Sequence, residues 1–230
     1  MATKKVSSSG EGTLAVPAPR FAVACFRLIG NAPYVGNKFS GEAREEMRLK
    51  QLAGSTARKG KKREPKDFDK GYRGAMHMLP DGRHGMPATA FRQALVSACR
   101  IVGFRMTLAK LAVFIVADGF DADPDDKSPL VAFTKGEPRR VDSYVRNETG
   151  VADIRPRPHW EPGWEVLLRI RYDADMFTAR DVLNLITRVG VQVGVGAGRP
   201  DSKNSCGQGW GTFDVEVVPD TIPAEFEESA

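Results

Sequence analysis

The strongest constraint on this chain is a concentration of glycine towards its C-terminal end. Seven of its 23 glycines lie within residues 189–213, where Arg199 and Lys203 stand near the middle and Trp210 lies between two glycines. Glycine adopts backbone angles closed to other residues and lets another molecule approach the backbone closely. The amides of such a loop can line a concave anion site, here with two cations beside it. We therefore predict a loop that grips a phosphate backbone through Gly196, Gly198, Arg199, Lys203 and Trp210.

The position of this glycine-rich segment argues against two common nucleotide-binding motifs. A dinucleotide fingerprint follows a strand and opens a helix, so that the pyrophosphate meets the helix N-terminus. Here the order is reversed, because a predicted helix at 178–189 leads in and a predicted strand at 212–218 follows. The segment also lacks the Gly-Lys-Ser/Thr ending of a P-loop. A helix C-cap followed by a hairpin without a ligand remains an alternative, although a C-cap needs only one glycine.

Hydrophobic periodicity predicts the elements that surround this segment. The predicted strands are 21–29, 72–78, 108–117, 130–133, 139–144, 165–172 and 212–218, and the predicted helices are 41–52, 87–102 and 178–189. Pro87 suits a first helical turn, and Thr178 with Asp181 comes close to a capping box. The first packed helix should bury an apolar face made of Phe91, Ala94, Leu95, Ala98 and Val102. The strands at 130–133 and 139–144 are expected to form a short hairpin.

This order of elements predicts an α+β fold. Two strand–helix–strand halves give a ferredoxin-like (RRM-like) antiparallel sheet with helices on one face. A long basic insertion at 40–73 would follow the first strand, and the glycine-rich loop would lie near the C-terminal end. We expect one domain over residues 20–218, between a disordered tail at 1–19 and an acidic tail at 219–230.

The insertion carries most of the excess positive charge. The chain has a formal charge of +5 and a pI near 9.2, which permits a polyanionic partner. A solvated loop and an electrostatic arm that becomes ordered on a polyanion are both compatible with this composition. Phe68 or Tyr72, at the end of the insertion, are candidates for base stacking. The candidate phosphate contacts in the arm are Arg58, Lys59, Lys61, Lys62, Arg63 and Lys66.

Metal, disulfide and membrane chemistry find little support in the sequence. Cys25, Cys99 and Cys206 are odd in number and form no CxxC pair, which fits a reducing cytoplasm. The acidic run at 121–126 lacks the glycine and glutamate of a calcium loop, so we expect no metal and no cofactor. No apolar run is long enough to cross a bilayer.

Two stretches of the chain resemble the RAMP superfamily. MPATAFRQALVSACR is similar to the segment in which a proline, a small residue and a basic helix follow a short turn. GVGAGRPDSKNSCGQGWGTFDV resembles the glycine-rich loop that lies between the last helix and last strand of the superfamily's ferredoxin-like domain. The superfamily includes CRISPR RNA-binding backbone subunits, which assemble as filaments along a guide, and CRISPR RNA-processing endoribonucleases. The basic insertion matches no motif of the family, and a diverged phage or mobile-element relative that binds single-stranded DNA is equally compatible.

Three functions therefore stand as expectations. The first is a non-enzymatic protein that binds RNA or single-stranded DNA and forms a homo-oligomer or filament, with Arg92 and Arg100 of the basic helix as further phosphate contacts. The second is a metal-independent endoribonuclease, for which His77 and His84 are the candidate acid and base. The third is a phage structural or assembly protein, in which the glycine-rich loop would contact another protein.

Overall fold

The computed structural model describes residues 17–39, 41–52, 67–146, 152–202 and 206–218. The strands of its larger sheet are β1 (Phe21–Gly30), β3 (His77–Met78), β4 (His84–Pro87), β5 (Val113–Val116), β6 (Gly119–Phe120), β7 (Pro129–Lys135), β10 (Glu165–Asp173) and β11 (Phe213–Val217). A smaller sheet consists of β2 (Tyr34–Val35), β8 (Pro138–Arg146) and β9 (Ala152–Trp160). The helices are α1 (Gly41–Leu52), α2 (Phe68–Gly74), α3 (Ala88–Ile101), α4 (Met106–Ala112) and α5 (Ala179–Arg188), and α5 continues into a π-helical turn, η1 (Val189–Val193).

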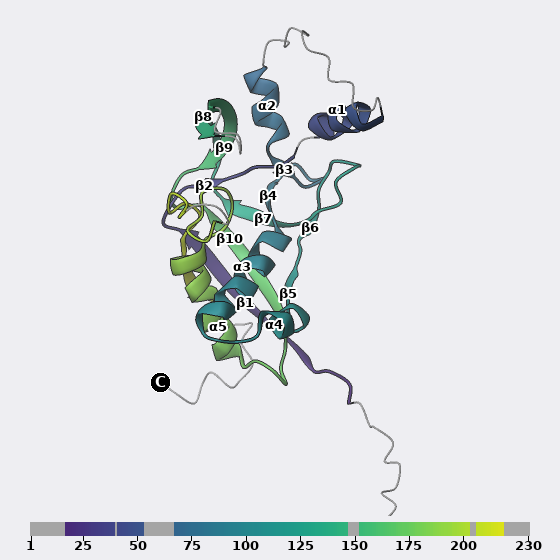
Figure 1. The fold of residues 1–230 in the computed structure, drawn as a ribbon. Coiled ribbons are helices and arrows are strands. Elements are labelled where there is room, and N and C mark those ends of the chain that lie inside the picture. The colour runs from purple at the N-terminus through teal and green to yellow at the C-terminus, as the bar shows by residue number, and fades with distance from the viewer. Residues whose placement is uncertain (1–16, 40, 53–66, 147–151, 203–205, 219–230) are drawn as a thin grey trace, which may run out of the picture.

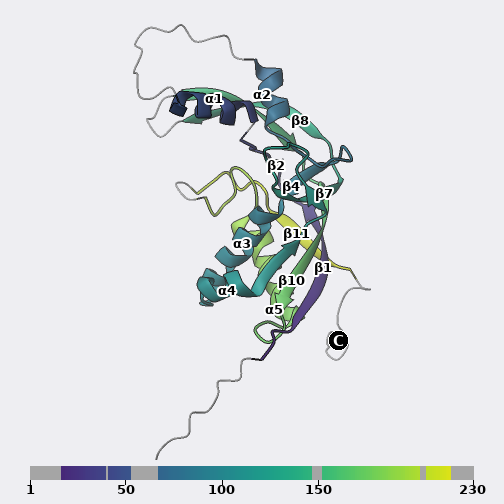
Figure 2. The same cartoon turned by 90° about the vertical axis from the view of Figure 1, so that its right-hand side faces the viewer.

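Both sheets are antiparallel, so the predicted α+β class is confirmed. The larger sheet has the order β11-β1-β10-β7-β4-β3, with β5 paired to β10 and β6 paired to β7. The smaller sheet has the order β2-β9-β8 and lies at the same end of the molecule as α1 and α2 (Figure 1). Figure 2 shows α3, α4 and α5 on one side of the strands β1, β10 and β11. The glycine-rich segment and α1 project on that same side.

The two packed helices form where local signals are strong. Pro87 is the N-cap of α3, and Gly103 follows its end with a positive φ of 72°, which suits a C-terminal glycine. Thr178 and Asp181 form a complete capping box at α5, as the sequence predicts. The apolar face of α3 is buried at Phe91 and Leu95, whereas Val102 is 48% exposed and does not belong to it.

One hydrophobic core joins the two sheets. Phe91 of α3 meets Phe213 of β11 edge-on, with ring centroids 6.5 Å apart. Tyr34 of β2 packs against Trp160 of β9, and Phe133 of β7 stacks on the same tryptophan at 4.6 Å. These rings belong to a single cluster of buried residues, so the smaller sheet is held against the larger one by apolar burial.

Three predicted elements differ in the structure. Residues 108–117 divide into α4 and β5, because the run MTLAKLA consists largely of good helix formers and the β-branched residues begin at Val113. Residues 72–74 are the last residues of α2, and within 72–78 only His77–Met78 form a strand. The hairpin between 130–133 and 139–144 is wrong, since β8 pairs with β9 while β7 pairs with β4, β6 and β10.

The predicted tails lie almost wholly outside the described residues, which begin at residue 17 and end at residue 218. Across the described ranges, none of the helices combines the length and apolar character that a membrane crossing requires.

Candidate functional site

The glycine loop, residues 194–202 and 206–211, folds closely onto itself and its neighbours. A Cβ atom at Gly211 would lie 1.8 Å from the carbonyl oxygen of Val195, and one at Gly207 would lie 2.0 Å from that of Arg199. Both glycines also have positive φ angles, 69° and 68°. Real Cβ atoms do not come this close to backbone oxygens, so only glycine fits at these two positions. Much of the glycine content is therefore required by the loop's own packing.

Backbone hydrogen bonds fix the loop against the segment that leads into β2. The amide of Gly211 donates to the carbonyl of Pro33 at 2.8 Å, and the amide of Ala197 donates to that of Val35 at 3.0 Å. Within the loop, the amide of Val195 donates to Gly211 and that of Gln208 donates to Gly198. These amides already have backbone partners, so fewer amides of the loop are available to bind an anion than the sequence predicts. The amides that make no hydrogen bond within the described chain include those of Gly196, Gly198 and Arg199.

Asp201 ties the glycine loop to α3. Its carboxylate accepts a hydrogen bond from the Ser97 hydroxyl and an ion pair from Arg100 at 2.9 Å. The Ser97 hydroxyl, followed by the Arg100 guanidinium, holds the pKa of Asp201 below its usual range. Arg100, which the sequence suggests as a phosphate contact, is thus engaged with a carboxylate. The two stretches that carry the RAMP resemblance contact each other here, although they are far apart in sequence.

A cavity of about 450 Å³ lies between α3 and the glycine loop. Its cations are Arg92 of α3, Lys110 of α4 and Arg199 of the loop, and its one carboxylate is Asp201. Volumes of this size are typical of ligand sites. The net charge of the residues that line the cavity is positive, which suits an anionic ligand.

Arg92 and Arg199 are positioned by the surrounding backbone. Arg92 donates to the carbonyls of Val113 at 3.0 Å and Lys110 at 2.5 Å, and its guanidinium lies 4.6 Å from the centre of the Phe114 ring. Arg199 donates to the carbonyl of Gly196 at 3.1 Å. These bonds use some of the N–H donors of each guanidinium and hold both positive charges beside the cavity.

Trp210 lies at the border between the glycine loop and the smaller sheet. A Cβ at Gly198 would lie 2.5 Å from its ring, and the ring of His159 meets it edge-on at 5.1 Å. The tryptophan is partly exposed, so it packs on the loop and still presents ring surface to solvent.

The other predicted stacking residues have partners in the smaller sheet. Tyr72 donates its hydroxyl to the carbonyl of Pro138, and Phe68 lies under the Arg140 guanidinium, whose centre is 5.5 Å from the ring centroid. The remaining predicted contacts, Arg58, Lys59, Lys61, Lys62, Arg63, Lys66 and Lys203, lie outside the described residues.

The structure does not bring His77 and His84 together. In the β3–β4 ladder His77 is paired with Gly85 and His84 with Met78. Side chains alternate between the faces of a ladder, so the two imidazoles point to opposite faces. His77 is bound to Asp121, and His84 lies edge-on to the buried Trp160. The expectation that they converge on one substrate is therefore not met.

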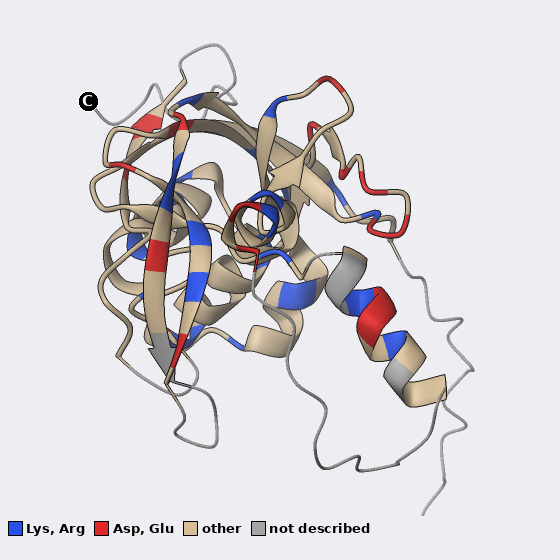
Figure 3. Cartoon of the chain, turned by 90° about the horizontal axis from the view of Figure 1, so that it is seen from above, with Lys and Arg blue, Asp and Glu red and all other residues tan. Residues whose placement is uncertain are grey.

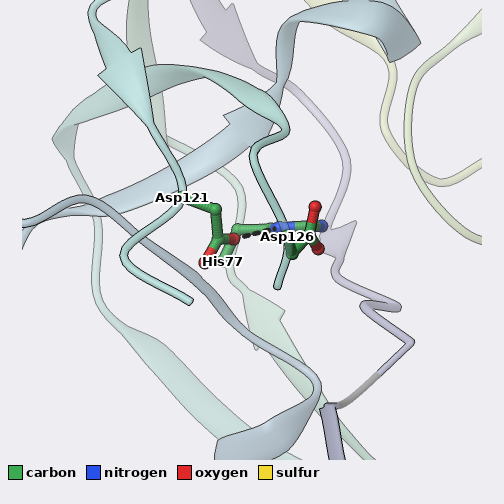
Figure 4. Close-up of side chains that lie close together, drawn as sticks. All are labelled: His77, Asp121 and Asp126. Atoms are coloured by element: carbon green, nitrogen blue, oxygen red, sulfur yellow. Dashed lines mark hydrogen bonds and ion pairs between the residues drawn. The ribbon is translucent and has the colours of Figure 1, made fainter. Parts of the chain in front are cut away.

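His77 belongs instead to a buried network of charges. Figure 4 shows its ring beside the carboxylates of Asp121 and Asp126, and its Nδ1 atom lies 2.7 Å from Asp121. The ammonium group of Lys38 lies 2.7 Å from the other oxygen of Asp121, and Arg44 of α1 pairs with Asp126 at 3.6 Å. Lys38 and Arg44 thus place two cations beside these two carboxylates, which offsets part of the cost of burying their charges.

Burial of two histidines makes stability depend on pH. Desolvation lowers the pKa of His159, with Arg139 adding to the effect, and desolvation also lowers the pKa of His84. The folded chain then binds protons less readily than the unfolded chain, whose histidines titrate at about pH 6.5. We expect the melting temperature to fall as the pH is lowered from about 7.5 to 5.5. His159→Gln should reduce this fall, and an identical pH profile in the variant would contradict the assignment.

Comparison with known proteins gives no family for this chain. A scan against protein-family models finds no match, and a search of curated proteins finds no significant relative.

Proposed function

We propose that this protein binds single-stranded nucleic acid, without catalysis, by gripping the phosphate backbone between α3 and the glycine loop. The observation that carries the proposal is the convergence of these two elements around a cavity with three cations, Arg92, Lys110 and Arg199. The partly exposed Trp210 at the edge of the loop supports stacking of a base next to a bound phosphate. RNA and single-stranded DNA both present these groups, so either is a ligand under this proposal.

We also propose that the fold is ferredoxin-like. The order β11-β1-β10-β5 supports this, since α3 leads from β1 towards β5 and α5 leads from β10 to β11. The elements α1 and α2 and the β8–β9 hairpin are then additions to that core. The RAMP resemblance agrees with such a fold, and assembly along a strand as a homo-oligomer or filament is part of the same proposal. Sizing the protein with and without an oligonucleotide tests the assembly.

The double variant Arg199→Gln/Lys203→Gln is expected to bind a labelled oligo-uridine or oligo-thymidine at least tenfold more weakly than the wild type. Each neutralised phosphate releases counterions, so the slope of log affinity against log salt should fall by about two. Fluorescence anisotropy over a series of salt concentrations measures both quantities.

The matched control removes the same charge elsewhere. Arg27 of β1 and Arg180 of α5 are exposed and do not line the cavity, so Arg27→Gln/Arg180→Gln should change affinity and slope little. Equal affinities for the wild type and the Arg199/Lys203 variant would overturn the placement of the site. The arrangement of His77 and His84 does not support an endoribonuclease activity. Cleavage of labelled RNA by the purified protein would favour that alternative over the present proposal.

A further inference from the structure

The hairpin of β8 and β9 carries a cation, Arg157, for which the described residues supply no partner. The guanidinium of Arg157 makes no hydrogen bond or ion pair within the described chain, and its Nε atom is buried. Burial, followed by the nearby charge of Arg155, lowers the pKa of Arg157. Removing a cation from water without compensation is unfavourable. Two other arginines of the hairpin do have acidic partners: Arg155 pairs with Asp153, and Arg139 pairs with Glu161.

The register of the hairpin shows which side chains share a face with Arg157. Its cross-strand partner is Val141, and the pairs on either side are Ser143 with Arg155 and Arg139 with His159. Residues two apart in a strand lie on one face, about 7 Å from each other. The face of Arg157 therefore includes His159, whose ring contacts Trp210 of the glycine loop.

The opposite face of the hairpin is covered by protein. Pro156 lies against α2, where a Cβ at Gly71 would come within 2.9 Å of its ring, and Trp160 is buried in the core. The face that carries Arg157 is partly exposed at Arg155 and Arg139, whose side chains are 46% and 63% accessible. Figure 3 shows the basic residues of both strands from the end that carries α1 and α2.

We propose that this face of the β8–β9 hairpin is a second contact for the nucleic-acid strand, in which Arg157 binds a phosphate next to a base stacked on Trp210. The proposal rests on the function inferred above and extends its site. An arginine fork binds a phosphate with two parallel hydrogen bonds, and within the described chain the Nε atom of Arg157 has no hydrogen-bond partner. The bound strand then passes from the cavity beside α3, over Trp210 and along β9, so that two elements distant in sequence hold successive nucleotides.

The test compares Arg157→Gln with Arg180→Gln in the full-length protein. Anisotropy titrations with labelled oligo-uridine and oligo-thymidine should show about tenfold weaker binding for Arg157→Gln. The slope of log affinity against log salt should fall by about one. Arg180→Gln removes an exposed cation of α5 and should leave both quantities close to those of the wild type. Arg157→Lys keeps the charge without the fork and should fall between the wild type and Arg157→Gln.

Thermal unfolding separates this role from a structural one. Because the cation of Arg157 is uncompensated in the fold, Arg157→Gln should melt at the same temperature as the wild type or higher. Unchanged affinity and slope in Arg157→Gln, or a loss of binding that follows a lower melting temperature, would overturn the inference while leaving the cavity intact. A wild-type protein that binds no oligonucleotide at low salt would overturn the proposed function and this extension together.

Discussion

Gly211→Ala is expected to destabilise the protein by about 3 kcal/mol or more. The added methyl group would stand 1.8 Å from the carbonyl oxygen of Val195, at a φ of 69° that L side chains rarely adopt. The same backbone position also exchanges hydrogen bonds, since Gly211 accepts from Val195 and donates to Pro33. Relief of the clash must separate Gly211 from Val195 within the glycine loop, so stability and oligonucleotide binding should fall together.

Gly209→Ala is the matched control for this substitution. Gly209 has a similar positive φ of 75°, but a Cβ atom there would meet nothing within 4 Å. Only the backbone strain remains, which costs about 1 kcal/mol. Chemical denaturation of the two variants measures the difference. Equal destabilisation by both substitutions would mean that Gly211 does not pack against Val195 as described.

Lys38→Met is expected to cost about 3–5 kcal/mol, because it leaves a buried carboxylate without its closest cation. The side chains of Lys38 and Asp121 are only 7% and 1% exposed, and their charged atoms lie 2.7 Å apart. Lys38 also lies 3.4 Å from Asp123, which is paired in turn with Arg44 of α1. The loss should therefore loosen the attachment of α1 as well as lower the free energy of unfolding.

Two controls isolate the buried charge. Lys135→Met removes a lysine that is 67% exposed and pairs with Glu165, and should cost less than about 1 kcal/mol. Lys38→Met/Asp121→Asn removes both charges and should recover part of the stability lost in the single variant. Because Lys38 and Arg44 already pair with Asp121, Asp123 and Asp126, a chelator should leave the melting temperature unchanged. A large effect of the chelator, or a mild effect of Lys38→Met, would contradict this description of the network.

The parts of the fold that follow from local chemistry could be predicted from the sequence. The helix at 41–52, the start of α3 after Pro87 and the capping box of α5 each depend on residues close to one another in the chain. The pairing of β8 with β9 could not be predicted in this way. It depends on which strands meet in space, and the prediction chose the nearer strand in sequence, β7.

The same distinction between local sequence and long-range contacts applies to the candidate site. The glycine content and the cation Arg199 identify the loop, because both are visible as composition and motif. The tie between Asp201 and α3 could not be seen, since its partners Ser97 and Arg100 lie about a hundred positions away in the chain. Arg157 was also missed. Alternation of arginine and proline in RPRPH indicates an extended segment, but only the packing of the hairpin shows that this guanidinium has no partner among the described residues.

Photo-cross-linking of a single-stranded oligonucleotide, followed by mass spectrometry of the cross-linked peptides, tests whether a nucleic-acid backbone lies between α3 and the glycine loop. Cross-linked peptides should then come from α3, from residues 194–211 and from β9. Cross-links confined to the opposite face of the sheet, around Arg27 and Arg171, or a complete absence of cross-links at low salt, would contradict it.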